Sequence, residues 1–286
     1  MTKTLWVIAG PTAVGKTAHC VALAKALHTE VISADSRQFY RELSIGTAKP
    51  KQEELQGIPH HFIDSHSIFD AFSPGDFERE ALEVLKVLFK TKDTVLATGG
   101  SGLYIKALMD GLDDMPEADL ALRAVLNQRY QAQGLEGLVQ ELKDKDPVYA
   151  QQVDLKNPQR VIRALEVCLS TGKPFSSFRL QQKKTRPFQV RKTCLYRERS
   201  ALYARIDARM DDMLANGLVE EAKAWYAHRD LYALKTIGYK EVFGYLDGAY
   251  NAEEMQRLLK RNSRHYAKKQ ETWFRHQGDF EWEALA

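Results

Sequence analysis

Cysteine is scarce in this chain, and the positions of the few cysteines exclude two common uses of the residue. Only Cys20, Cys168 and Cys194 are present, far apart and without C-x-x-C spacing. A zinc site or a disulfide framework needs clustered or paired cysteines, so neither is expected. Unpaired thiols are typical of a reducing compartment, which predicts a cytoplasmic protein.

Long hydrophobic runs are also missing. No stretch approaches the roughly 18 apolar residues that a membrane-spanning helix needs, so no membrane contact is predicted. No segment repeats at a fixed period and none has low complexity. The 286 residues are 44% hydrophobic, which is enough for the packed core of one large or two modest domains.

Charge is unevenly distributed along the chain. The formal net charge is only +3, but residues 155–209 carry 14 Lys and Arg against 3 Asp and Glu. The segments on either side are net acidic. A basic block of this kind favours a polyanionic partner, and nucleic acid is the main candidate. A solvated basic face is the alternative reading of charge alone.

A complete phosphate-binding loop, or P-loop, occupies residues 10–17, with the sequence GPTAVGKT. A buried-strand pattern at 5–9 precedes it, and a helical pattern at 16–27 follows. Glycines let backbone N–H groups turn toward an anion, and the helix N-terminus adds partial positive charge. The motif predicts a polyphosphate or diphosphate ligand, with Lys16 on phosphate oxygens and the Thr17 hydroxyl on Mg²⁺.

The alternation of apolar runs with helical patterns predicts an α/β fold, a P-loop NTPase-like parallel sheet core. Further strands are expected at 30–34, 61–63, 94–98 and 193–196, with helices at 77–89, 103–109 and over most of 200–276. Between about 116 and 189 helical periodicity dominates. We therefore expect a catalytic core of 1–115 and 190–286 and a mostly helical insertion of 116–189.

Two further loops are expected beside the P-loop, because ligands of open α/β sheets bind at the carboxyl ends of the strands. The loop at 35–38 begins with Asp35, whose carboxylate can accept a proton or bind metal through water. The loop at 98–102 reads TGGSG, where a P-loop NTPase usually has an acidic metal-side residue. The site is therefore expected to hold a diphosphate without the usual hydrolytic arrangement.

With these motifs the chain resembles the bacterial tRNA dimethylallyltransferase family, also called tRNA isopentenyltransferases. The resemblance runs in order through GPTAVGKT at 10–17, DSRQFY at 35–40, IGTAKP at 45–50 and GGSGLY at 99–104. It continues with NPQRVIRALE at 157–166, IGYKE at 237–241 and KKQETWFR at 268–275. It implies transfer of a dimethylallyl group from dimethylallyl diphosphate to N6 of the adenine 3′ of the anticodon in tRNA.

The resemblance also implies roles for individual residues. Asp35 would accept the N6 proton and act in catalysis with Lys16 and Thr17. The Thr17 hydroxyl would hold Mg²⁺. Some relatives carry Arg at the position of Lys240, and many carry Thr at Ser101. Diphosphate would be bound by Gly10, Pro11, Thr12, Ala13, Val14, Gly15, Lys16, Thr17 and Lys240.

The resemblance implies contact with the tRNA anticodon stem-loop for a second set of residues. It also implies a monomer. Basic and aromatic residues at 260–269 also suit RNA contact, whereas Trp273 is expected in the core. The implied tRNA contacts are Asp35, Ser36, Arg37, Gln38, Ser101, Arg123, Gln159, Arg160, Val161, Ile162 and Arg163.

Three other functions compete with this one. A P-loop small-molecule kinase would require ATP, and the missing strand-end Asp counts against it. An isopentenyltransferase acting on free adenine nucleotides would not need the long basic insertion. An RNA-binding module with a vestigial nucleotide fold would not need intact Lys16, Thr17 and Asp35.

Overall fold

The computed structural model describes residues 2–180, 182–277 and 279–285. The chain forms two compact units: Met1–Asp110 with Thr185–Ala286, and Gly111–Lys184. Both ends of the smaller unit lie a few residues earlier in the chain than those of the expected insertion of 116–189. Packing explains the difference. Met115 packs against the core of the smaller unit, whereas Phe188 is buried in the core of the larger one.

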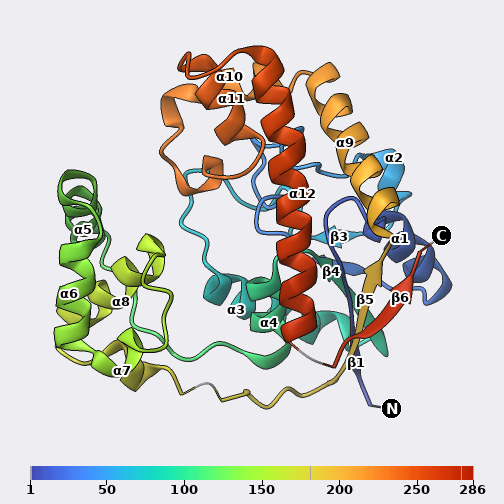
Figure 1. Ribbon diagram of the computed structural model, residues 1–286. Helices are drawn as coiled ribbons and strands as arrows, with labels where there is room; N and C mark the ends of the chain where they lie inside the picture. The colour runs from blue at the N-terminus through green and yellow to red at the C-terminus, as the bar shows by residue number, and fades with distance from the viewer. Residues whose placement is uncertain (1, 181, 278, 286) are drawn as a thin grey trace. The chain divides into compact units, whose positions relative to one another are not determined.

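The larger unit is built on a six-stranded sheet with the order β3-β2-β4-β1-β5-β6, and all of its strand pairs are parallel. The predicted α/β class with a parallel sheet is therefore confirmed (Figure 1). β6 was not expected from the sequence. The strands are β1 Thr4–Ala9, β2 Val31–Ser33, β3 His60–His61, β4 Thr94–Gly99, β5 Gln189–Tyr196 and β6 Glu281–Ala284.

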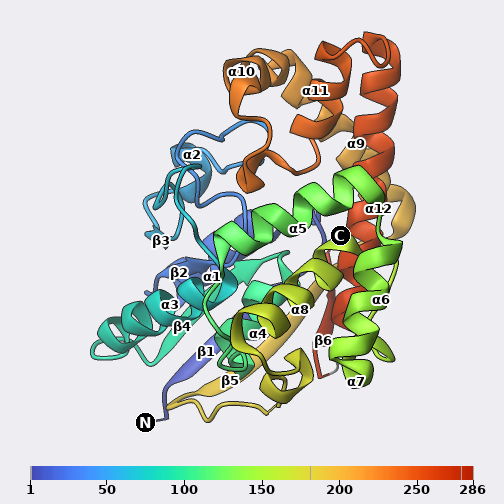
Figure 2. The same cartoon turned by 90° about the vertical axis from the view of Figure 1, so that its left-hand side faces the viewer.

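Helices surround this sheet, and the longest, α12, contacts α4, α9 and α11 (Figures 1 and 2). None of the described helices is long and apolar enough to cross a membrane. The helices of the larger unit are α1 Lys16–Ala26, α2 Gln52–Leu55, α3 Pro74–Leu88, α4 Gly102–Asp110, α9 Arg199–Ala215, α10 Leu218–Ala224, η2 Tyr226–His228, η3 Tyr232–Leu234, α11 Tyr239–Leu246 and α12 Ala252–His276.

The smaller unit is helical throughout its described part, as expected for the insertion. Its elements are α5 Leu120–Gln133, α6 Glu136–Lys145, α7 Pro147–Ala150, α8 Pro158–Thr171 and η1 Phe175–Phe178. Local sequence fixes both ends of α8: the Asn157 side chain caps its first turn, Pro158 opens it, and Gly172 ends it at φ 69°. Its apolar face forms the centre of the unit's own core.

The sheet brings the loops after β1, β2 and β4 to one edge. Ala9 pairs with Gly99, and Ser33 pairs with Thr98, so the three strands end at the same level. Gly99 is required there because a Cβ atom on it would lie 2.3 Å from the Ala34 carbonyl oxygen. Two backbones thus touch directly where the second and third loops begin.

We expect Gly99→Ala to lower the free energy of unfolding by about 2 kcal/mol or more, because neither backbone can retreat from the added methyl group. Urea denaturation followed by circular dichroism measures this change. Gly75→Ala is the matched control in the same unit, since its Cβ would meet only the Ser73 hydroxyl at 3.7 Å. Equal unfolding free energies for the two variants would contradict this account of the contact.

Candidate functional site

The P-loop joins β1 to α1 in a conformation that wraps around a central space. Gly10 has φ 150°, and Gly15, immediately before the first residue of α1, has φ 115°. A side chain at Gly10 would also collide with the Leu195 carbonyl oxygen on β5, at 2.7 Å. Both glycines of the motif are therefore required by the backbone itself.

Lys16 is held inside this loop by the loop's own carbonyl groups. Its ammonium donates to the Gly10 oxygen at 2.9 Å and to the Pro11 oxygen at 2.8 Å. Burial lowers the pKa of Lys16 to about 8, partly offset by the negative charge of Asp35. The carboxylate after β2 thus lies near enough to the P-loop lysine to stabilise its charge.

Three arginines that sequence reasoning did not assign to the site contact the outside of the P-loop. Arg205 donates to the Ala13 oxygen at 2.9 Å, and Arg197 donates to the Val14 oxygen at 2.8 Å. Arg209 lies 3.5 Å from the Thr12 hydroxyl. Burial and the neighbouring Arg205 lower the pKa of Arg209. These residues place positive charge beside an anion-binding loop.

The spacing of two of these arginines was a usable signal. Arg205 and Arg209 are four residues apart on α9, so they share one helix face, and both fall in the basic block. Nothing in the sequence shows that this face meets the P-loop, because α9 lies almost two hundred residues further along the chain. The contact is a product of the fold.

Asp35 organises the second loop as a side-chain-capped turn. Its Oδ1 atom accepts hydrogen bonds from the Arg37 and Gln38 backbone N–H groups, at 2.9 and 3.4 Å. Within the described residues, Oδ2 accepts none, so one carboxylate oxygen is available to a ligand. The turn therefore fixes the carboxylate through Oδ1 and leaves Oδ2 without a hydrogen bond from a described residue.

The second and third loops are joined by two serines. The Ser36 N–H donates to the Ser101 hydroxyl at 2.9 Å, and that hydroxyl donates to the Ser36 hydroxyl at 3.0 Å. Burial of its hydroxyl raises the pKa of Tyr266 to about 12. The charge of Asp35 also raises this pKa, whereas a hydrogen bond with Ser101 lowers it. The predicted convergence of the loops at 35–38 and 98–102 is confirmed.

Arg37 and Gln38 are each engaged within the protein. The Gln38 amide donates to the Thr47 and Ala48 carbonyl oxygens at 3.3 and 3.1 Å. The Arg37 guanidinium lies over the Tyr232 ring, 4.6 Å from its centroid. Tyr232 is 59% exposed, so the outer side of this stacked pair faces solvent.

Helix α12 contacts two loops of the site through Gln270, another residue that sequence reasoning missed. This buried amide accepts from the Thr12 N–H at 2.8 Å and donates to the Gly100 oxygen at 3.0 Å. It therefore ties the P-loop to the loop after β4. Trp273, expected in the core, is half-buried and packs over Gly102, where a Cβ would lie 2.4 Å from its ring.

Two basic residues of α12 pair with acidic residues of α9. Lys260 contacts Asp211 at 2.7 Å, and Arg264 contacts Asp207 at 2.6 Å. Tyr266 is 40% exposed. The expected RNA contact of residues 260–269 stays a prediction, and two of its cations already have carboxylate partners in the protein.

The residues present fit a Mg²⁺ ion bound together with a diphosphate. The Thr17 hydroxyl lies in the first turn of α1 and forms no hydrogen bond to any other described residue. No group of three or more acidic, His or Cys side chains in the described chain could hold a metal alone. Mg²⁺ commonly takes few protein ligands and completes its shell with substrate phosphates and water.

Lys240 lies apart from the residues that contact the P-loop. It is exposed at the start of α11, and its backbone N–H bonds to the Thr236 oxygen. Among the described residues, it forms no hydrogen bond to residues 10–17. A role for Lys240 on the diphosphate stays a prediction.

In the smaller unit, two of the expected RNA-binding arginines meet on a buried carboxylate. Glu166 is fully buried and accepts from Arg123 Nε at 2.6 Å, from Arg163 and from the Asp119 N–H at 3.1 Å. Arg163 also donates to the Pro116 oxygen at 2.6 Å. Both guanidinium groups are thus fixed inside their unit, with part of each still exposed.

The remaining members of the expected RNA-binding segment divide between surface and core. Gln159 and Arg160 are exposed at the start of α8. Val161 is fully buried and Ile162 is 4% exposed, so these two side chains serve the unit's core. A side-chain contact from Val161 to RNA is therefore not expected, and this part of the prediction is corrected.

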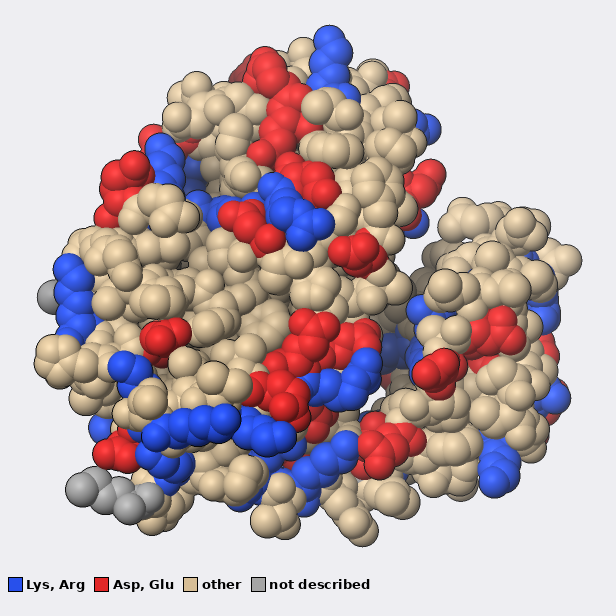
Figure 3. All heavy atoms as spheres, turned by 180° about the vertical axis from the view of Figure 1, so that it is seen from behind, with Lys and Arg blue, Asp and Glu red and all other residues tan. Residues whose placement is uncertain are grey.

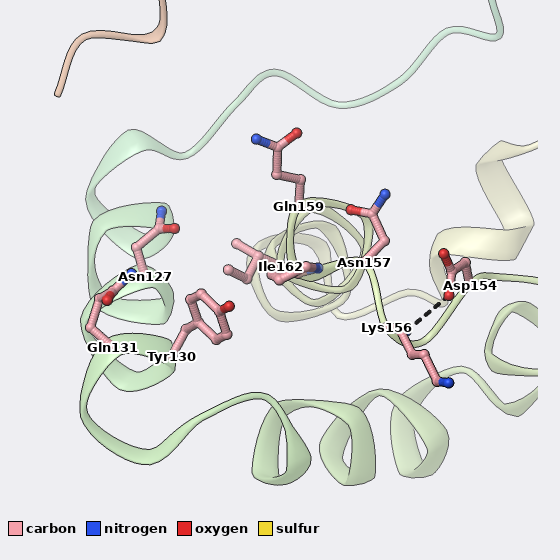
Figure 4. A pocket seen from close by; sticks show the side chains of 9 residues that line it. Asn127, Tyr130, Gln131, Asp154, Lys156, Asn157, Gln159 and Ile162 are labelled. Carbon is pink, nitrogen blue, oxygen red and sulfur yellow. Dashed lines mark hydrogen bonds between the residues drawn. The ribbon is translucent and has the colours of Figure 1, made fainter. Parts of the chain in front are cut away.

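A hollow of about 440 Å³ lies beside this end of α8 (Figure 4). It is lined by amide side chains from both helices, among them Asn127 and Gln131 on α5 and Gln159 on α8. Tyr130 and Ile162 form its apolar part. Figure 4 shows amide side chains around the Tyr130 ring.

The basic block of residues 155–209 does not act as one charged surface. Arg186 is buried against Glu78 at 2.8 Å, while Arg205 and Arg209 face the P-loop. On the face shown in Figure 3, Lys and Arg side chains are interspersed with Asp and Glu. Only part of the block is therefore free for a polyanionic partner.

We expect the affinity for inorganic diphosphate to fall above about pH 8. Lys16 carries its proton below that pKa and loses it as the pH rises, so an ammonium needed by the anion disappears. The loss should approach tenfold per pH unit for one linked proton. Isothermal titration calorimetry from pH 6.5 to 9.5 measures it.

Lys16→Met is the control for this pH profile. It should bind diphosphate weakly and show no change of slope near pH 8, while the ligand's own titration remains. The same change of slope in both proteins would remove Lys16 as its cause.

Known proteins are similar to this chain in sequence and in fold. The IPP transferase family profile matches residues 38–277. The tRNA dimethylallyltransferase of Cytophaga hutchinsonii is 52% identical over 98% of this chain and 92% of its own length. The tRNA dimethylallyltransferase 1 of Bacteroides fragilis is 48% identical over 98% and 93%.

Solved structures agree. A full-length tRNA isopentenylpyrophosphate transferase from Bacillus halodurans superimposes with a TM-score of 0.72 at 40% identity, over 99% of this chain and 90% of its own. A eukaryotic dimethylallyltransferase acting on tRNA superimposes with a TM-score of 0.79 at 27% identity, over 99% and 74%. The family profile covers most of the chain, and the relatives span nearly all of it. The chain belongs to the IPP transferase family.

Proposed function

We propose that this protein transfers the dimethylallyl group of dimethylallyl diphosphate to N6 of the adenine 3′ of the anticodon in tRNA, releasing diphosphate. One observation carries the proposal: Lys16, Asp35 and Ser101, from loops after three strands, meet at one edge of the sheet. The names of the relatives, which are tRNA dimethylallyltransferases, supply the substrates.

The P-loop side of the site would bind the diphosphate as a leaving group. As the C1–O bond of the isoprenoid breaks, its electron pair stays on the diphosphate, so negative charge grows there. Lys16, the P-loop N–H groups and Arg209 would stabilise this charge; Lys16 lies within the loop and Arg209 contacts Thr12. To bind the anion, the Lys16 ammonium would exchange the Gly10 and Pro11 carbonyls for phosphate oxygens.

Asp35 would receive the proton that the amine loses. The adenine N6 forms its bond to C1 and gives up one proton, which the free Oδ2 atom can accept. The amine is a poor nucleophile, so its placement beside C1 contributes more than basicity. The Ser36 and Ser101 hydroxyls would orient the base, which must leave its stack to reach them.

A Mg²⁺ ion would be held by Thr17 and the diphosphate. When bound, it would neutralise charge on the leaving group. The Thr17 hydroxyl would contribute the protein's direct ligand.

The tRNA side of the proposal rests on both units. In the smaller unit, exposed Gln159 and Arg160 and the partly exposed Arg123 and Arg163 would contact the anticodon stem-loop. In the larger unit, residues 35–38 would meet the loop nucleotides. We further propose a monomeric cytoplasmic enzyme, in keeping with three buried free cysteines.

The direct test incubates the protein with labelled dimethylallyl diphosphate, Mg²⁺ and an unmodified tRNA anticodon stem-loop. Label on the RNA is the expected result. Label on free AMP instead would favour a nucleotide isopentenyltransferase. Absence of label from both acceptors would overturn the proposal.

We expect Asp35→Asn to lose at least about 100-fold in kcat while retaining tRNA affinity. Asparagine keeps an oxygen for the Arg37 and Gln38 N–H groups, so the turn survives while the proton acceptor is lost. Single-turnover prenylation and filter binding of the stem-loop measure the two quantities. Turnover at the wild-type rate would exclude Asp35 as the proton acceptor.

We expect Arg160→Ala to weaken tRNA binding and to reduce the slope of log K against log salt by about 1, because one phosphate contact is lost. Filter binding between 50 and 200 mM KCl, a range of about fourfold, measures the slope. Arg129→Ala is the control, since it removes the same charge from the same unit but breaks only the contact with Glu141. An equal decrease in slope for both variants would indicate a nonspecific effect of net charge.

A further inference from the structure

Two sequence motifs are not explained by the contacts of the candidate site described above: IGTAKP at 45–50 and, apart from the predicted role of Lys240, IGYKE at 237–241. The structure brings them together. A Cβ on Gly46 would lie 2.6 Å from the Tyr239 ring, and one on Gly238 would lie 3.3 Å from the Gly46 oxygen. Among the described residues, neither motif forms a hydrogen bond to the P-loop, and the two motifs pack against each other instead.

A single carboxylate, that of Glu221 on α10, joins the two motifs. Its Oε2 atom accepts from the Ser44 and Ile45 N–H groups, both at 2.9 Å. Its Oε1 atom accepts from the Gly46 N–H at 2.9 Å and from the Tyr239 hydroxyl at 2.6 Å. Three consecutive backbone donors thus converge on one side chain, as they would on a bound anion.

The environment of this carboxylate supplies donors rather than a cation. No described Lys, Arg or His forms an ion pair with Glu221. Tyr239 is fully buried, and burial and the Glu221 charge both raise the pKa of its hydroxyl, which keeps it protonated as a donor. All four contacts therefore require an acceptor with two oxygens.

The segment held by Glu221 continues directly into the contacts of the second loop. The next two residues, Thr47 and Ala48, accept the hydrogen bonds from the Gln38 amide. Gln38 in turn donates its backbone N–H to the Asp35 carboxylate at 3.4 Å. Ala48 adopts φ 50°, so this segment keeps a conformation that an unsupported alanine rarely takes.

The other end of the segment is also fixed. The Lys49 ammonium donates to the Tyr40 oxygen at 2.7 Å and contacts Asp64. The side chain of Lys49 is only 6% exposed. Residues 44–49 are therefore clamped at both ends, by Glu221 before the Gln38 acceptors and by Lys49 after them.

We propose that Glu221 is a positioning residue for the Asp35 loop: through residues 44–48 and Gln38 it sets the orientation of the carboxylate that takes the proton. This inference rests on the proposed role of Asp35. Glu221 touches neither substrate. It acts on the rate of the chemical step and leaves the diphosphate site in the P-loop unchanged, because its hydrogen bonds go to residues 44–46 and Tyr239 and not to residues 10–17.

The test is Glu221→Gln, which is nearly the same size but replaces one acceptor oxygen with an N–H₂ group. That group would face N–H or O–H donors, so at least one of the four contacts becomes donor against donor. Glu220→Gln is the matched control, because it removes the same charge from an exposed neighbour on α10. We expect kcat for stem-loop prenylation to fall about 10- to 100-fold in Glu221→Gln alone.

A second measurement separates positioning from loss of folded protein. Calorimetric titration with inorganic diphosphate should give the wild-type Kd and stoichiometry for Glu221→Gln. A stoichiometry that falls in proportion to kcat would overturn the proposal, since it would show that the variant is simply unfolded. Wild-type kcat in Glu221→Gln would overturn it equally.

Asp35→Asn separates this inference from the function on which it rests. If Asp35→Asn turns over normally, the proton-acceptor role fails and the inference fails with it. If Asp35→Asn is inactive and Glu221→Gln is as active as Glu220→Gln, only the positioning role is wrong. Tyr239→Phe, which removes one donor and keeps the three backbone bonds, should lose less activity than Glu221→Gln.

Discussion

The direct contact between two backbones, Gly99 against Ala34, is the constraint on which the candidate site depends. The parallel register ends β1, β2 and β4 at one level, but register alone would leave the loops side by side. Because no side chain separates Gly99 from Ala34, Ser101 can reach Ser36, and the third loop closes onto the second. Gln270 then fastens the P-loop to the same loop. The proposed anion site, proton acceptor and base pocket can therefore lie together only because Gly99 has no side chain.

The parts of the site that the sequence predicted are those encoded locally. The P-loop, the Asp35 turn and the small residues at 98–102 each depend on a few neighbouring residues, so their conformations follow from a short motif. Arg209, Gln270 and Glu221 contact these loops across 170 residues or more, and no local pattern specifies which loop they reach. Strand β6, short and partly exposed, likewise carried too weak a pattern.

The insertion shows the same division within a single motif. The run from Gln159 to Arg163 was assigned to RNA as a block, but helical geometry sends its members to different places. Val161 enters the core, Arg160 faces solvent, and Arg163 turns to Glu166. A buried carboxylate with two guanidinium partners costs desolvation energy that apolar packing would avoid. In this chain the carboxylate holds two arginines in fixed directions on a small helical unit.

The position of β1 in the sheet has a consequence for synthesis on the ribosome. β1 is an interior strand of the sheet, with β4 on one side and β5 on the other. The strand β5 is translated only after the whole of the smaller unit, so one edge of β1 stays unpaired until residue 196 has emerged. The P-loop is therefore completed only after Leu195, on which Gly10 packs, has been translated. Until then a nascent chain carries an open, apolar sheet edge, the kind of surface that chaperones bind.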